Sequence, residues 1–327
     1  MTHVPWLAAY IYQEEPWTNL LIQSVKPLVA KVLSEGLADG YFFIRYWERG
    51  AHIRLRFRGD VEKMERELKP LLDAHFKEWF KASPSHRETL EWAKNLPEDQ
   101  QWYPNDSLQY IDYEPEYERY GGTGAGISIS EQQFQACSDA VLQVISESGD
   151  WGYDRALGVA IQMHLGFAFA MGMDLAELKA FYNRISFAWL SRAYNYGSET
   201  TEKEHRERRA EAREAFSKTF EQQRDMLEPF CKTLWEAFNE GVEFEQDWIN
   251  QWIRDMKDVN DQLHAGAHEI EFPSARVFQN DDNVSEERRK FWPILESYIH
   301  MTNNRLGILN RDEAFLGYLI ENTMDRL

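Results

Sequence analysis

The sequence predicts an α+β protein that is predominantly helical, with a small antiparallel β-sheet or hairpin in its N-terminal third. The chain has 327 residues, of which 43% are hydrophobic and 14% aromatic, so it can bury a large core. Apolar and polar residues alternate over 41–59, as they do in paired strands. Beyond Trp151 the apolar residues recur at helical spacing instead.

The first third mixes both kinds of element. Helical spacing over 17–33 predicts a helix that bends or restarts at Pro27, and helical spacing returns over 61–81. Between these segments, YFFIRYWERGAHIRLRFRG predicts a two-stranded hairpin around the turn-like ERG. The polar stretch 82–107 predicts loops and a short helix, and SLQYIDY predicts another short strand. YEPEYERYGGTGAGISIS, rich in glycine, predicts an ordered loop.

The rest of the chain predicts helices. Ser130 with Gln133, and Asn310 with Glu313, have the spacing of capping boxes at helix starts. Helices are expected over 154–171, 175–194, 202–238, 244–264 and 285–305, with a last one after Asn310. Mixed charges over 201–216 favour a solvated helix face over a nucleic-acid arm. We expect a single domain over 1–327, with strands mainly in 1–130 and helices in 131–327.

Composition excludes several classes of function. The chain has 36 Lys and Arg against 55 Asp and Glu, a net charge of −19, which argues against direct nucleic-acid binding. Only Cys137 and Cys231 are present, so neither a disulfide framework nor a Cys-rich zinc site is expected. The N-terminus lacks signal-peptide features, and Gln162 and His164 interrupt the most apolar stretch, 155–174. We expect a cytoplasmic protein without membrane contacts.

The predicted hairpin gathers arginines. If strand alternation holds, one face is apolar and the other is cationic. The apolar face would hold Phe42, Ile44, Tyr46, Ile53, Leu55 and Phe57, and the cationic face Arg45, His52, Arg54, Arg56 and Arg58. Guanidinium groups in a fixed array bind carboxylates or phosphates through paired hydrogen bonds. A solvated face balanced by Glu48 and Asp60 is the alternative.

Two later segments could also carry chemistry. Arg119 lies between tyrosines in the glycine-rich loop, although an ordinary structural loop is the simpler interpretation of that segment alone. In SYIHMTNNRLG, His300 and Asn304 share a helix face and Arg305 is adjacent. Histidine suits proton transfer at neutral pH, but a lone helical histidine is more often simply packed. No HExxH, GxSxG or GxxxxGK[ST] motif occurs, so no metal site, common hydrolase or kinase is expected.

Taken together and in this order, FFIRYWERGAHIRLRFRG, YEPEYERYGG and HMTNNRLG resemble the C-terminal elimination domain of class I lanthipeptide dehydratases, also called the thiopeptide-type bacteriocin biosynthesis domain. The opening PWLAAYIYQEEPWTNLLIQSVKPLV is similar to that domain's start, so the resemblance covers essentially the whole chain. It implies that the essential arginines of the family's HxRxR strand fall on Arg54 and Arg56, the arginine of its RYGG loop on Arg119, and its late histidine on His300.

The resemblance implies a lyase that acts on a ribosomally made peptide. In this family a separate large domain glutamylates Ser or Thr of a precursor peptide with glutamyl-tRNA, and the elimination domain removes glutamate to leave dehydroalanine or dehydrobutyrine. Arginines suit the anionic glutamate and the developing enolate, and histidine suits proton transfer. The residues expected to be catalytic are Arg56, Arg119 and His300, and those expected to bind substrate are Arg54, Arg45, Asn304 and Arg305, without cofactor or metal.

The sequence does not contain the large glutamylating domain, so we expect a separate glutamylation protein to supply the modified precursor peptide. Homodimerisation rests on the resemblance alone. One alternative is a stand-alone pyridine synthase of thiopeptide macrocyclisation, which joins two dehydroalanines by a formal cycloaddition and expels the leader peptide; such enzymes tend to have lost the eliminating residues. The other is a non-catalytic peptide-binding subunit of a split dehydratase, which would not need an intact Arg119 and His300.

Overall fold

The computed structural model describes residues 5–88, 95–193, 201–274 and 284–324. Within them the chain forms a four-stranded antiparallel sheet early in the sequence and mostly helices after it, which confirms the predicted α+β class. The chain divides into two compact units. The first unit is Met1–Glu116 with Phe134–Trp151, and the second is Tyr117–Gln133 with Gly152–Leu327.

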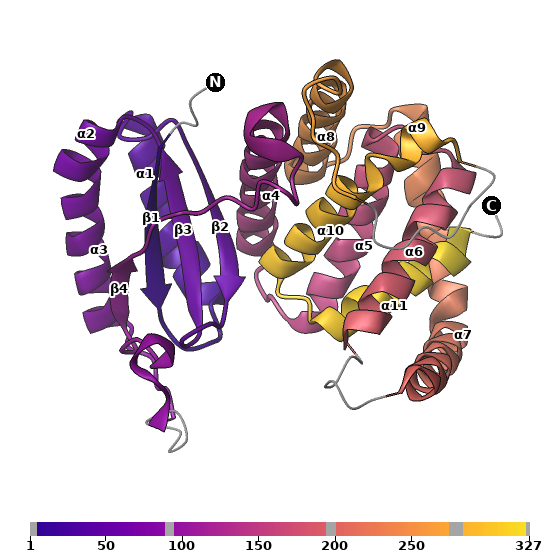
Figure 1. Ribbon diagram of the computed structural model, residues 1–327, viewed down its shortest axis with the longest axis horizontal. Helices are drawn as coiled ribbons and strands as arrows, with labels where there is room; N and C mark the ends of the chain where they lie inside the picture. Colours follow the sequence, from indigo (N-terminus) through magenta and orange to yellow (C-terminus); the bar gives the residue numbers. More distant parts are fainter. Residues whose placement is uncertain (1–4, 89–94, 194–200, 275–283, 325–327) are drawn as a thin grey trace. The chain divides into compact units, whose positions relative to one another are not determined.

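The sheet of the first unit has the strand order β2-β3-β1-β4 (Figure 1). Strand β1 is central, between β3 and β4, and its existence was not predicted. Its sequence WLAAYIY shows no apolar–polar alternation because nearly all its side chains are buried, as is typical of a strand covered on both faces. The strands are β1 Trp6–Tyr12, β2 Gly40–Tyr46, β3 His52–Arg58 and β4 Ser107–Tyr110.

The register of the β2–β3 hairpin corrects the predicted faces. Tyr46 pairs with His52, and Phe42 pairs with Arg56. Directly paired residues project from the same face of a sheet, so the even-numbered residues of both strands share one face. The predicted assignment was therefore wrong: Phe42 and Ile44 lie with the arginines, whereas Arg45 lies on the opposite face with Ile53, Leu55 and Phe57. The turn 47–51 contains an odd number of residues, and for this reason even-numbered residues of β2 pair with even-numbered residues of β3.

Several helices of the first unit lie alongside the sheet. Pro27 lies in the first turn of α1, directly after a π-helical turn, which confirms the predicted restart. Figure 1 shows α1 and α3 alongside the strands. The elements are η1 Leu20–Val25, α1 Lys26–Ser34, α2 Val61–Lys63, η2 Met64–Leu68, α3 Lys69–Ala82 and η4 Glu98–Gln100.

Helix α4 (Ile127–Glu147) binds the outer edge of β2 through side chains. The backbone N–H of Tyr41 donates to Gln135 at 3.3 Å, and that of Phe43 donates to Ser138 Oγ at 3.2 Å. Pairing these edge groups protects the strand from pairing with another chain. The helix begins three residues before Ser130, whose hydroxyl donates to the carbonyl of Gly126, the residue directly before the helix, so the predicted capping box there was wrong.

The described part of the second unit is helical. Its predicted segments are confirmed to within a few residues, except that the helix expected over 285–305 is divided into two helices, α9 and α10. Most of the charged half of α7 is exposed. Among the described residues, no helix combines the length and apolarity needed to cross a membrane. After the turn η5 Gly122–Gly126, the helices are α5 Tyr153–Ala170, α6 Leu175–Ala193, α7 Glu202–Glu240, α8 Asp247–Ala265, α9 Glu286–Arg289, α10 Trp292–Leu306 and α11 Asn310–Thr323.

Candidate functional site

The even-numbered face of the sheet holds the arginines of β3 on a layer of aromatic rings. Arg54 is opposite Tyr10 of β1, and its guanidinium lies 4.7 Å from that ring and 3.6 Å from the ring of Tyr46. Its Nη2 also donates to Glu48 at 3.0 Å, but this carboxylate is largely exposed. Aromatic faces stabilise a cation without neutralising it. Arg54 is therefore held in place while keeping much of its electrostatic attraction for an anion.

His52 fixes the other side of Arg54. Its Nδ1 donates to the Gly50 carbonyl at 2.8 Å, which leaves Nε2 to accept from Arg54 Nε at 3.0 Å. Burial, together with the positive charges of nearby arginines, lowers the pKa of His52 to about 4, and the hydrogen bond with Gly50 offsets part of this effect. The ring is thus neutral at pH 7, the state that can accept this hydrogen bond.

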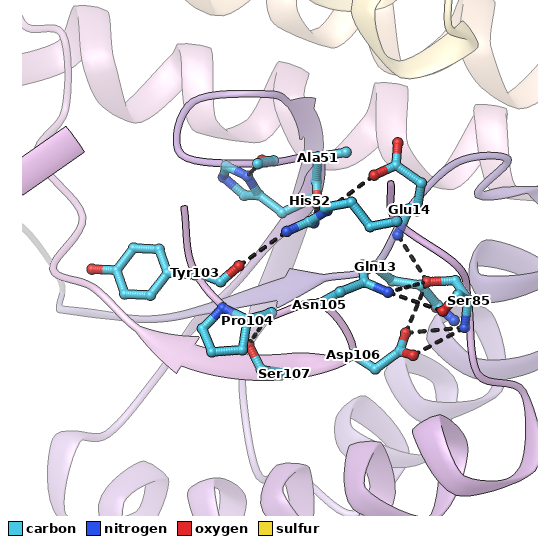
Figure 2. A network of polar contacts seen from close by, with 12 residues as sticks. Gln13, Glu14, Ala51, His52, Ser85, Tyr103, Pro104, Asn105, Asp106 and Ser107 are labelled. Carbon is cyan, nitrogen blue, oxygen red and sulfur yellow. Dashed lines mark hydrogen bonds and ion pairs between the residues drawn. The ribbon is translucent and has the colours of Figure 1, made fainter. Parts of the chain in front are cut away.

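A polar network braces the end of the strand that carries His52 (Figure 2). Arg87 donates to Glu14 at 3.0 Å, to the Tyr103 carbonyl at 2.9 Å and to the Ala51 carbonyl at 3.1 Å. Beside it, Asp106 accepts from the backbone N–H and the hydroxyl of Ser85. These contacts join segments far apart in sequence and hold the hairpin turn in one conformation.

Arg56 is a buried cation surrounded by aromatic rings. Its residue is only 7% exposed, and its guanidinium lies between the rings of Phe42 at 5.2 Å and Tyr113 at 4.3 Å. Nη2 reaches the Tyr10 hydroxyl at 3.4 Å, and Nε has no hydrogen-bond partner among the described residues. Within the part of the chain that the structure describes, no carboxylate lies at ion-pair distance from it. A buried charge in this state favours binding of an anion.

Arg45 does not join this arginine face. It lies on the opposite side of the sheet, with its guanidinium 5.8 Å from the Trp17 ring. Burial lowers its pKa to about 10, and the carboxylate of Glu15 offsets part of that effect. We therefore leave Arg45 out of the proposed binding site.

In the second unit, the glycine-rich loop presents Arg119 to helix α10. Gly121 and Gly122 have φ angles of 86° and 91°, a conformation that favours glycine. The preceding Tyr120 is buried with its ring stacked on Tyr298 of α10. This arrangement brings Arg119 Nε to the hydroxyl of Ser297, to which it donates at 3.0 Å. The ordered loop predicted for this segment is confirmed up to Gly126, whereas the residues from Ile127 onward belong to helix α4.

His300 lies one turn after Ser297 on α10, so Arg119 and His300 flank the same stretch of helix. The Nδ1 of His300 is 3.0 and 3.1 Å from the two carboxylate oxygens of Glu313, from α11. Its ring stacks on Trp189 of α6, with centroids 4.4 Å apart. The side chain is 19% exposed, so the imidazole is oriented by both partners yet is still accessible.

Glu313 corrects the second predicted capping box. Helix α11 has Leu309 at its N-cap and no side-chain cap. The carboxylate of Glu313 is directed into the unit instead, where it also accepts from Asn303 Nδ2 at 3.1 Å. The spacing Asn310 to Glu313 matched the motif by chance, because burial against α10 decides where the side chain goes.

The two remaining predicted residues differ in burial. Asn304 is half-buried and one turn beyond His300, so it can share that helix face. Arg305 is 0% exposed and donates from Nη1 to the Met301 carbonyl of its own helix at 3.0 Å. A substrate cannot reach a guanidinium in that position, and we leave Arg305 out of the proposed site.

The predicted residues thus form two groups, each within one unit. Arg54 and Arg56 share one face of β3, and Arg119 and His300 flank α10. Sequence analysis missed Tyr113, Trp189 and Glu313 as partners of these residues, and no sequence motif marks them. Among the described residues, no group of three or more His, Cys, Asp or Glu side chains could hold a metal ion.

Comparison with known families identifies the class of protein. The family model for the lantibiotic biosynthesis dehydratase C-terminal domain matches residues 6–324. The chain belongs to this family. A search of the curated proteins found no match.

Solved structures share the fold. The pyridine synthase TbtD from thiomuracin biosynthesis superposes with a TM-score of 0.74 at 15% identity, covering 99% of this chain and 98% of that one. The tRNA-dependent lantibiotic dehydratase MibB from Microbispora sp. 107891 gives a TM-score of 0.62 at 20% identity, covering 100% of this chain but 28% of MibB. TsrL gives a TM-score of 0.66 at 18% identity, with coverages of 99% and 95%. Such identities establish the fold alone.

Proposed function

We propose that this chain is a lyase that eliminates glutamate from glutamylated Ser or Thr of a ribosomally made precursor peptide. The observation that carries the proposal is the buried guanidinium of Arg56, which has aromatic neighbours but no carboxylate partner among the described residues. The leaving glutamate, with its free carboxylate and departing ester oxygen, supplies the anion that this cation lacks. The family match supports a peptide of this kind as the substrate.

The reaction requires three tasks. A base removes the α-proton, the C–H electron pair forms the Cα=Cβ double bond, and the Cβ–O bond breaks so that glutamate leaves as a carboxylate. We assign Arg56 and Arg119 to the glutamyl group and the enolate-like intermediate, with Arg54 in support. His300 transfers the proton, because it is a half-buried imidazole oriented by a carboxylate.

The proposal includes partners. A separate protein that uses glutamyl-tRNA glutamylates the precursor peptide in the cytoplasm, and this chain then acts on the product. MibB is described as a tRNA-dependent lantibiotic dehydratase, and this chain spans 28% of its length.

Elimination can be tested with purified protein and a synthetic precursor peptide that carries a glutamyl ester on one serine. We expect mass spectrometry to show loss of glutamic acid. The Arg119→Ala and His300→Ala proteins should still bind the glutamylated peptide but leave it unchanged. Arg66→Ala, at an exposed site on η2, is the matched control and should eliminate glutamate normally. Full activity of both site variants would contradict the assigned roles, and binding without any elimination by the wild type would favour a non-catalytic subunit.

Cycloaddition of the pyridine synthase type is the second candidate. It is favoured by the likeness to TbtD, which extends over 98% of that enzyme. Against it, the arginines and the histidine expected for elimination are all present here. A peptide with two dehydroalanines distinguishes the candidates, because a pyridine synthase would convert it to a macrocycle and release the leader peptide.

A further inference from the structure

A chain of buried polar side chains continues from His300 into the second unit. The side chain of Glu313 is completely buried, and it contacts His300 on one side and Asn303 on the other. Asn303 Oδ1 is 2.9 Å from Nε2 of His164, a fully buried residue of α5. We call Glu313, Asn303 and His164 the buried relay. It connects α11, α10 and α5, which are distant in sequence.

The donors and acceptors of the relay fit together in one way. A carboxylate only accepts hydrogen bonds, so the Asn303 atom that faces Glu313 is the amide nitrogen, and its oxygen faces His164. His164 must then carry its proton on Nε2. Burial lowers the pKa of His164 to about 4, so its ring is neutral at pH 7 and cannot also carry a proton on Nδ1. Each member of the relay thereby fixes the orientation of the next.

The same logic applies to His300. Within the described part of the chain, no Lys or Arg pairs with Glu313, so His300 and Asn303 are its two donors. An unprotonated Nδ1 would place a lone pair against a buried carboxylate, which is unfavourable. The proton of the neutral imidazole is therefore on Nδ1. Nε2 is then the ring nitrogen that carries the lone pair. The ring itself is stacked on Trp189.

We propose that Glu313 is a positioning residue that, held by Asn303 and His164, keeps a proton on Nδ1 of His300 and so makes Nε2 the atom that accepts the α-proton of the substrate. This inference rests on the proposed elimination. An Nε2–H bond forms as the Cα–H bond breaks, the electron pair becomes the Cα=Cβ bond, and glutamate leaves with the Cβ–O pair. The imidazolium then returns its proton to water.

The tautomer can be measured without substrate. Nitrogen-15 NMR of ring-labelled histidine distinguishes Nδ1–H from Nε2–H, and the spectrum of His300→Gln identifies the His300 signals among the nine histidines. We expect Nδ1–H in the wild type. In Glu313→Gln the new amide can donate to Nδ1, so the proton should move to Nε2. A wild-type spectrum with Nε2–H would overturn the proposal, even if Glu313→Gln does not fold.

Kinetics supply the second measurement. Glu313→Gln should lower kcat for elimination by about 100-fold or more, the usual contribution of a general base, with little change in KM. Glu313→Asp, which restores an acceptor, should recover part of that loss and the Nδ1–H signal. If the wild type eliminates nothing, the proposed function itself fails. If the wild type eliminates and Glu313→Gln is equally fast, the role of Glu313 alone fails.

Discussion

Buried His164 should make the stability of the second unit depend on pH. Its folded-state pKa is about 4, lowered by burial from an ordinary value of 6.5, and the hydrogen bond with Asn303 only partly offsets this. The unfolded chain therefore binds a proton more readily than the folded chain does. Stability from this ring is complete above about pH 6.5 and is lost as the pH falls towards 4.

The size of the effect follows from the two pKa values. One pKa unit corresponds to about 1.4 kcal/mol, so between pH 7 and pH 5 this ring alone should lower the free energy of unfolding by about 2 kcal/mol. His164→Gln keeps an N–H donor near Asn303 but cannot titrate. Its free energy of unfolding should therefore fall by about 2 kcal/mol less than that of the wild type over the same interval.

Urea unfolding at pH 7, 6 and 5, followed by tryptophan fluorescence, measures this difference. His52, whose pKa burial also lowers to about 4, is present in both proteins and cancels from the comparison. His268→Gln is the matched control, since that side chain is 76% exposed, and it should keep the wild-type dependence. Equal losses of stability in wild type and His164→Gln would refute the reasoning.

Two further predictions concern the candidate site and the loop beside it. Arg56→Lys should lower kcat/KM for elimination by about 10- to 100-fold in the mass-spectrometric assay, because an ammonium cannot reproduce the paired hydrogen bonds of a guanidinium. Near-normal activity of this variant would argue against the role assigned to Arg56. Gly126→Ala should lower Tm by several degrees, because the added Cβ would lie 2.3 Å from the Tyr120 carbonyl oxygen. Gly158→Ala, within α5 and with no atom within 4 Å of the new Cβ, should instead raise stability by about 0.5–1 kcal/mol; thermal shifts of the same sign would contradict this pair.

Periodicity predicted the fold best where one face of an element is exposed. The amphipathic helices were found because polar residues mark their solvent side, whereas the β2–β3 hairpin was found because charged and apolar residues alternate in its sequence, although both strands are largely buried. Strand β1 was missed because it is buried on both faces and shows no alternation. The hairpin's faces were misassigned because the register depends on the length of the turn, which the ERG motif does not specify.

The candidate site shows a different limit. Arg54, Arg56, Arg119 and His300 could be nominated from residue chemistry and from the order of three motifs. Their partners could not, because the contact of His300 with Glu313 depends on how α10 and α11 pack. Arg305 was included as a binding residue because it follows Asn304 in the sequence. Successive residues of a helix project about 100° apart, however, and the side chain of Arg305 is buried in the core.

As the proposed lyase, this chain breaks the bond between glutamate and a modified serine by removing the serine's α-proton. The most direct measurement uses a precursor peptide whose glutamylated serine carries deuterium at Cα. We expect a dehydroalanine product that has lost both glutamic acid and the deuterium label, formed more slowly than from the protonated peptide. A bound peptide that retains its glutamate and its label would contradict it.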